Sequence, residues 1–177
     1  LFGIAGTQTA AFVWAGHQFP GLGTTAEQWD GSSWTSSTNV STNREQGGSS
    51  GNGGTNTAAF YIGGGPPESA LHEQWNGSSW AEAGDLNTAR RANFAMATNN
   101  DYAVTGGGEG TGTTDGYTLV EQYDGSAWTE VANTNVESYN NASSPSGTAG
   151  LMIGQTDSPY ATTEEWTVGQ NIKVLTD

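Results

Sequence analysis

The chain contains no cysteine among its 177 residues, so neither a disulfide nor a thiolate metal site can hold it together. Basic residues are also scarce, because four Lys and Arg stand against 18 Asp and Glu and give a formal net charge of −14. This charge repels a phosphate backbone and an anionic membrane surface. No apolar run approaches the roughly 20 residues that span a bilayer. We therefore expect no nucleic-acid partner and no membrane insertion.

Histidine is nearly absent as well, which weakens enzymatic hypotheses. The only two histidines are His17 and His72, and no nucleophile motif lies near either of them. We expect His17 in an exposed loop and His72 in a strand, where its role is structural. Sialidase-like chemistry would need a cluster of arginines to hold a carboxylate, whereas the chain has only Arg44, Arg90 and Arg91. We predict that the protein is not an enzyme and binds no cofactor or metal.

Glycine and aromatic residues are abundant instead. The chain has 27 Gly, 7 Trp, 6 Tyr and 5 Phe, and only 12% of its residues are charged. Many glycines between short apolar runs indicate short strands joined by turns. Aromatic side chains bury a large surface from few positions. These features predict one all-β domain with an aromatic core.

A repeat of about four dozen residues organises the chain. A Glu followed two residues later by an aromatic residue recurs every 43 to 48 residues, at Glu27, Glu73, Glu121 and Glu164. In the first three copies an Asp-Gly or Asn-Gly pair and then a tryptophan follow, at Trp34, Trp80 and Trp128. A period in the forties is typical of a propeller blade. The chain thus divides into approximate units of residues 1–38, 39–86, 87–134 and 135–177.

Each unit is interpreted as four strands. An apolar run ends in glycine, an alternating segment such as 117–123 follows, Asp-Gly or Asn-Gly closes a hairpin, and the tryptophan strand comes next. After a polar connection, a segment such as 93–97 starts the following unit. One such sheet cannot bury both faces alone, so neighbouring sheets must stack, and a radial arrangement protects their edges. We predict a β-propeller with four four-stranded antiparallel blades.

The units resemble kelch repeats, in which an apolar strand ends in paired glycines and is followed by an aromatic residue and then a tryptophan. The pairs here are Gly63-Gly64 and Gly106-Gly107. The fourth unit departs from the pattern, because it lacks the tryptophan and residues 171–175 replace its last strand. Kelch propellers commonly have more blades, so three arrangements stay open: a small closed ring, the C-terminal part of a longer chain, and a half-ring completed by a second copy.

The repeats are also similar to those of structural proteins from environmental and marine tailed phages. This resemblance rests on segments such as Glu-Gln-Trp-Asp-Gly-Ser-Ser-Trp at residues 27–34 and Asn-Thr-Ala-Arg at residues 87–90. It implies a virion or extracellular location and binding by loops on one face of the propeller. Virion or fibre subunits, a glycan and further copies of the chain are the partners that it suggests.

Two sets of charged residues recur at fixed positions in the repeat. The four glutamates could ring a channel and bind Ca²⁺, which favours several oxygen ligands, but a repeated packing or surface role is the favoured interpretation. Arg44 and Arg90 occupy equivalent positions, so we expect them to make a repeated structural hydrogen bond between blades. In the third copy of this segment, Ser138 stands in place of the arginine.

The segments between the second and third strands of the units differ from one another, which makes them the best candidates for binding. All four should leave the sheets on the same face. Aromatic side chains there could stack on a sugar ring or on a partner protein. The candidate binding residues are His17, Phe19, Glu68, Asp115, Asp157 and Tyr160.

The leading hypothesis is therefore a non-catalytic binding module of a virion or extracellular assembly, with a host-surface glycan or a protein as partner. A purely architectural subunit of a capsid, tail or fibre is the first alternative, and a glycan-active enzyme is the second. Three glycosylation sequons begin at Asn39, Asn76 and Asn141.

Overall fold

The structure, a computed structural model, describes residues 3–18, 20–51, 55–110, 112, 116–140, 142–144, 146–154, 162–167 and 173–175. Over these residues the fold is all-β, with four antiparallel sheets of four strands each. The predicted fold class is confirmed. No helix able to cross a membrane occurs in the described part of the chain.

Each sheet takes its strands from one continuous stretch of sequence. The first contains β1 (Gly3–Thr7), β2 (Ala10–Trp14), β5 (Ala26–Trp29) and β6 (Trp34–Ser36), and the second contains β7 (Gly48–Gly51), β8 (Ala59–Ile62), β9 (His72–Trp75) and β10 (Trp80–Glu82). The third contains β11 (Phe94–Asn99), β12 (Tyr102–Gly106), β13 (Val120–Tyr123) and β14 (Trp128–Glu130), and the fourth contains β15 (Ala142–Ser143), β16 (Ala149–Ile153), β17 (Thr163–Thr167) and β18 (Lys173–Leu175). Strands that follow one another within a sheet pair antiparallel.

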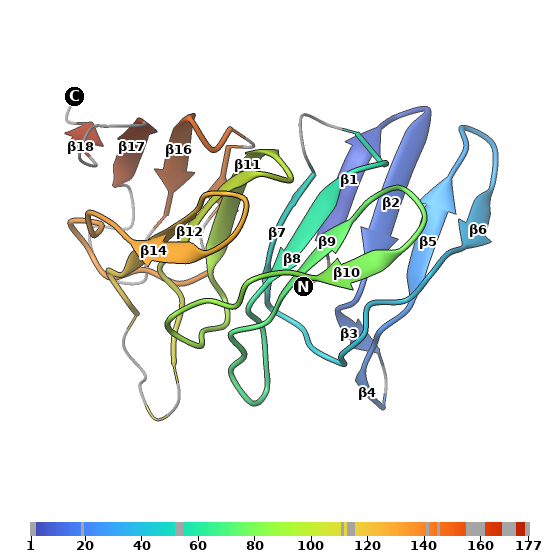
Figure 1. Cartoon of the computed structure of the whole chain (residues 1–177), viewed down its shortest axis with the longest axis horizontal. Helices are drawn as coiled ribbons and strands as arrows, with labels where there is room; N and C mark the ends of the chain where they lie inside the picture. Colours follow the sequence, from blue (N-terminus) through green and yellow to red (C-terminus); the bar gives the residue numbers. More distant parts are fainter. Residues whose placement is uncertain are drawn as a thin grey trace.

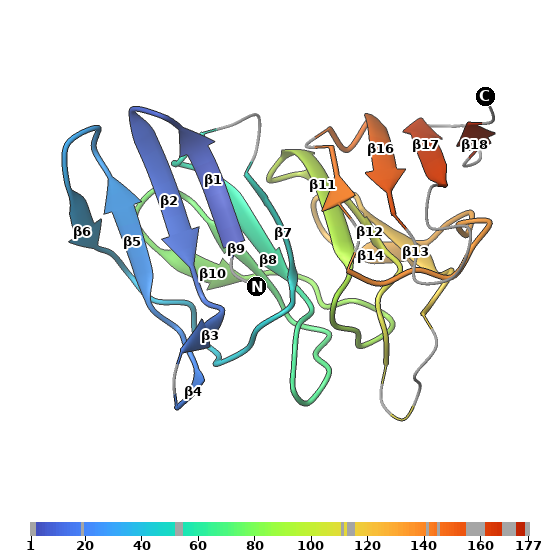
Figure 2. The same ribbon diagram turned by 180° about the vertical axis from the view of Figure 1, so that it is seen from behind.

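The sheets are arranged like the blades of a propeller. Their first strands lie together, β1 beside β7, β7 beside β11, and β11 beside β15. The sheets succeed one another in chain order, so that β6 lies at one end of the molecule and β18 at the other (Figures 1 and 2). The described residues thus form an open row of blades, in which the first and fourth sheets do not face each other.

Each sheet has a leading face, which points toward the next sheet along the chain, and a trailing face, which points back. Because successive strand residues point to opposite faces, Phe12 and Trp14 lie on the leading face of the first sheet. They pack against Tyr61 and Trp75 on the trailing face of the second sheet. Phe12 stacks on Trp75 with ring centroids 4.5 Å apart.

The same arrangement recurs at the next two interfaces. Phe60 and Ile62 on the leading face of the second sheet pack against Tyr123 and Trp128 of the third. The leading face of the third sheet then packs against the fourth through Phe94, Met96, Val104, Val120, Met152 and Trp166. The core therefore consists of three layers between sheets, each built from a leading and a trailing face.

In the second and third sheets a glycine pair follows the second strand, where the backbone turns into the left-handed region. Gly63 and Gly64 have φ values of 67° and 104°, and the matching pair in the third sheet is Gly107 and Gly108, with 61° and 85°. The predicted pair Gly106-Gly107 was therefore one residue too early, because Gly106 still belongs to β12. A Cβ atom at Gly63 would lie 2.6 Å from the carbonyl oxygen of Arg90. Because glycine has no Cβ, the connection that carries Arg90 can pass close to it.

Asp-Gly or Asn-Gly closes the hairpins before the tryptophan strands, as predicted. Only the glycine has a positive φ, at 96° for Gly31. The side chain of Asp30 stabilises the turn, because its Oδ1 accepts hydrogen bonds from the backbone N–H groups of Ser32 and Ser33, at 2.8 and 2.9 Å. The hydroxyl of Ser32, then these backbone bonds and the hydroxyl of Ser33, lower the pKa of Asp30 to about 2. Asn76 and Asp124 make the same contacts in the next two blades.

Burial between sheets can be tested at one repeat position that carries isoleucine twice. Ile62 is fully buried on the leading face of the second sheet, whereas the equivalent Ile153 of the fourth sheet is 51% exposed. Ile62→Ala should lower the free energy of unfolding by about 2–5 kcal/mol because it leaves a cavity. Ile153→Ala should change it by about 0.5 kcal/mol. Urea denaturation of both variants measures this difference, and equal losses would contradict the layered packing.

Candidate functional site

The variable connections of the first three sheets leave at one edge, which we call the loop edge (lower edge in Figure 1). It comprises the connections after β2, β8 and β12. The predicted common face is confirmed for these three. The fourth variable connection, after β16, lies largely outside the described residues. In the first sheet the connection is not a plain loop, because β3 (His17–Gln18) pairs with β4 (Gly21–Leu22) as an extra hairpin.

His17 joins this hairpin to the chain that enters the second sheet. Its Nδ1 lies 3.2 Å from Oε2 of Glu45, and its side chain is 60% exposed. Glu45 in turn pairs through its backbone with Gly65, with N···O distances of 3.0 and 2.8 Å. Gly65 precedes the Pro66-Pro67-Glu68 segment, so the loops of the first and second sheets are linked through Glu45.

Arg91 makes the corresponding link between the second and third sheets. Its Nε lies 3.0 Å from Oε1 of Glu109 and 3.4 Å from Oε1 of Glu68. The backbones of Arg91 and Glu109 also form an antiparallel bridge. The loop edge is therefore one continuous surface, in which side chains from three blades hold one another in place.

The candidate binding residues have different outcomes. The structure places His17 and Glu68 on the loop edge, each in contact with a charged partner. Phe19, Asp115, Asp157 and Tyr160 lie outside the described residues. Sequence reasoning did not find Glu45, Arg91 and Glu109. A signal was available, since Glu45 and Arg91 each directly follow a repeated arginine and hold equivalent positions in the repeat.

The repeated glutamates and arginines meet between the sheets. Nη2 of Arg44 lies 2.8 Å from Oε2 of Glu73, and Nη2 of Arg90 lies 2.7 Å from Oε1 of Glu121. All four side chains are almost completely buried. Burial lowers the pKa of both guanidinium groups, and the facing carboxylate opposes this shift in each pair. The expected repeated structural bond is present, and it ties the connection between two blades to the sheet that this connection enters.

Each pair also holds the connection that carries the arginine. The carboxylate of Glu73 accepts the backbone N–H of Ser41 at 2.8 Å, and that of Glu121 accepts the backbone N–H of Asn87 at 2.7 Å. The third interface works without an arginine, because Asn135 donates both its backbone and its side-chain N–H to Glu164, at 2.9 Å each. The glutamates therefore fasten successive blades. No cluster of three or more metal-ligating side chains occurs in the described part of the chain.

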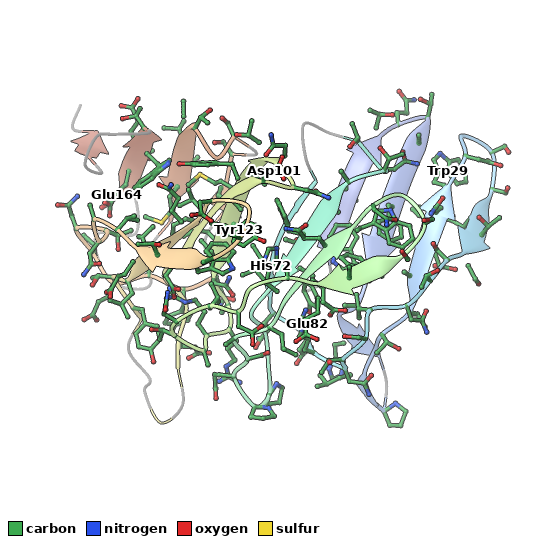
Figure 3. All side chains as sticks on the ribbon, viewed as in Figure 1. Trp29, His72, Glu82, Asp101, Tyr123 and Glu164 are labelled. Atoms are coloured by element: carbon green, nitrogen blue, oxygen red, sulfur yellow. The ribbon has the colours of Figure 1, made fainter. Side chains whose placement is uncertain are left out.

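His72 is the other histidine, and its surroundings are apolar. Figure 3 shows it between the second and third sheets, near Tyr123. Its ring meets that of Tyr123 edge-on at 4.8 Å, and its Nδ1 accepts a hydrogen bond from Nε1 of Trp128 at 3.3 Å. Burial lowers the pKa of His72 to about 4, so the ring is neutral near pH 7. The predicted structural role is confirmed.

A hollow lies along the first strands of the last three sheets. Its volume is about 420 Å³, and its lining is uncharged, with Gly48, Asn93 and Ser143 among the residues that form it. Backbone hydrogen bonds join the segments that precede these three strands. The N–H of Ala92 donates to the carbonyl of Gln46 at 2.6 Å, and the N–H of Asn140 donates to the carbonyl of Ala92 at 2.8 Å. This hollow offers backbone and amide groups to a ligand and no ionisable pair.

In comparisons with known proteins, no protein-family model and no curated protein matches this chain.

The buried ion pairs make a direct prediction for stability. Glu121→Gln removes a negative charge and leaves the guanidinium of Arg90 buried without a counter-ion, so the free energy of unfolding should fall by about 3–5 kcal/mol. Glu27→Gln is the matched control, because Glu27 holds the same repeat position but is exposed, and it should change stability by about 0.5 kcal/mol or less. Thermal and urea unfolding measure both. Similar effects at the two positions would show that the buried pair contributes nothing specific.

Proposed function

We propose that the protein is a non-catalytic binding module of a virion or another extracellular assembly, and that the loop edge contacts its partner, a host-surface glycan or a protein. The observation that supports this proposal is the loop edge itself. Three connections that differ in sequence stand side by side on a scaffold that repeats, and His17–Glu45 and Glu68–Arg91–Glu109 fix them relative to one another. Variable loops on a rigid scaffold are a common design for recognition.

The charge of the loop edge narrows the class of partner. Its described side chains include the carboxylates of Glu45, Glu68 and Glu109, against the single guanidinium of Arg91. The chain as a whole carries a formal net charge of −14. This field repels sialylated or sulfated sugars. A neutral glycan or a protein surface with basic residues fits better.

A purely architectural role is the second candidate, and one observation favours it. Large apolar side chains are exposed on the two end sheets, Ile4 and Trp34 on the first and Leu151 and Ile153 on the fourth. Exposed apolar surface of this kind is typical of contacts between subunits. In this role the protein decorates or extends a capsid, tail or fibre.

Binding of the purified protein to an array of immobilised neutral and acidic oligosaccharides tests the first function. We expect binding to neutral members, weakened about tenfold or more by either of two substitutions. His17→Ala removes a side chain of the loop edge, and Glu68→Gln removes the charge that faces Arg91. Asp101→Asn is the control, since Figure 3 places Asp101 at the opposite edge, and it should bind like the unchanged protein.

Two results would contradict this function. Turnover of a bound glycoside that stops with one Asp or Glu substitution would show an enzyme. Absence of array binding, together with filaments or large particles in light scattering, would support the architectural role instead.

A further inference from the structure

A cavity opens on the trailing face of the first sheet, which no other sheet of the described residues covers. Its volume is about 370 Å³, and its lining includes Val13, Ala15, His17, Thr25, Glu27 and Trp34. Glu27 is exposed, and Trp34 is 47% exposed. At the same repeat position Trp128 is only 5% exposed, because the second sheet covers it. The first sheet therefore carries the trailing face of an interface without the sheet that would complete it.

The residues around this cavity correspond to those that surround the buried arginines elsewhere. In the second sheet, Arg44 donates to the carbonyl oxygens of Tyr61 and Leu71 and to the carboxylate of Glu73. The equivalent residues of the first sheet are Val13, Thr25 and Glu27, and all three line the cavity.

The third sheet repeats this arginine site. Arg90 donates to the carbonyl oxygens of Gly107 and Leu119 and to Glu121. Two of the equivalent groups in the first sheet belong to Ala15 and Thr25, which also line the cavity. The two occupied sites share the glutamate carboxylate and the carbonyl of Leu71 or Leu119, whereas the second carbonyl belongs to Tyr61 in one and to Gly107 in the other. The first sheet has the equivalent shared groups in Glu27 and Thr25, and no described arginine occupies them.

The backbone around the cavity already has the shape of the occupied sites. The N–H of Ala15 donates to the carbonyl of Thr25 at 2.9 Å. The equivalent bonds are Gly63 to Leu71 at 2.9 Å and Gly107 to Leu119 at 3.1 Å. Ala15 also adopts the same left-handed conformation as those glycines, with φ of 57°. The acceptors are therefore preorganised, although no described residue donates a hydrogen bond to the carboxylate of Glu27.

We propose that this cavity is a binding site for the guanidinium group of an arginine, presented by the connection of another sheet of the same repeat type. That connection has the form Asn-Thr-x-Arg, as at residues 87–90. Its arginine reaches the carboxylate of Glu27 and the carbonyl oxygens beside it, and its asparagine N–H caps the same carboxylate, as Asn87 caps Glu121. The leading face of that sheet then covers Ile4 and Trp34. This inference goes beyond the proposed function, because it concerns the trailing face of the first sheet, which meets the loop edge at His17.

A second copy of the chain fits this site less well than such a sheet. The leading face of its fourth sheet offers Leu151 and Ile153, which suit the apolar part of the surface. However, its arginines are engaged, because Arg44 and Arg90 are buried and Arg91 pairs with Glu68 and Glu109. Its remaining basic residue is Lys173 in β18, and a lysine ammonium lacks the planar fork with which a guanidinium reaches a carboxylate and neighbouring carbonyls together. Covering Glu27 without a cation would bury a carboxylate that has no partner, which is strongly unfavourable. An arginine-bearing connection is therefore the occupant that the charge of the cavity selects.

The test uses the full chain and a capped peptide with the sequence of residues 84–90, Gly-Asp-Leu-Asn-Thr-Ala-Arg. Titration followed by two-dimensional NMR should shift the backbone amides of Val13, Ala15 and Glu27 and the indole N–H of Trp34 at millimolar peptide. A peptide with citrulline in place of arginine keeps the shape of the side chain and loses its charge. Its affinity should therefore be lower by about tenfold or more.

Variants of the chain complete the test. Glu27→Gln should weaken binding of the arginine peptide to the level of the citrulline peptide. Glu137→Gln makes the same change of charge at another exposed position and should bind like the unchanged chain.

Three results would overturn the proposal. They are the absence of shifts at the cavity, equal binding of the two peptides, and self-association of the chain alone that Trp34→Asp abolishes. The last result would show that a second copy covers this face.

Discussion

The contact between the leading face of one sheet and the trailing face of the next is the interaction on which the whole fold depends. A four-stranded sheet with apolar residues on both faces cannot be stable alone, so each blade needs neighbours. Phe12 on Trp75, His72 edge-on to Tyr123, and Met96 with Met152 are three forms of one contact. Residues at equivalent positions of the repeat lie on the same face of each sheet. A side chain is therefore buried where a neighbouring sheet covers that face.

Two buried ion pairs accompany the apolar contacts between blades. The Arg44–Glu73 and Arg90–Glu121 pairs join the connection that leaves one blade to a strand of the blade that it enters, so they fix where that connection lies. A buried ion pair is weak support for stability by itself, because desolvation offsets much of the attraction. Its value here lies in placing the connection, whose next residue reaches the loop edge. Packing between blades and the geometry of the loops are thereby coupled through Glu45 and Arg91.

The sequence alone was sufficient to predict the sheets, because Glu27, Glu73, Glu121 and Glu164 mark the repeat and strand alternation orients everything around them. It also predicted the roles of Arg44, Arg90 and His72. The sequence did not predict two features that depend on the path of the backbone. The left-handed pair at Gly107 and Gly108 follows a glycine that belongs to the strand, so three consecutive glycines hid the boundary. The partners of His17 and Glu68 were missed because they come from connections that only the fold brings close.

Hydrogen exchange of the native protein tests the central claim most directly, since backbone amides exchange more slowly where neighbouring sheets protect a strand from local opening. The second and third sheets are covered on both faces, whereas the first and fourth are each covered on one. The account predicts the slowest exchange in β8 and β12 and clearly faster exchange in the equivalent strands β2 and β16. Uniform protection across all four strands would contradict it.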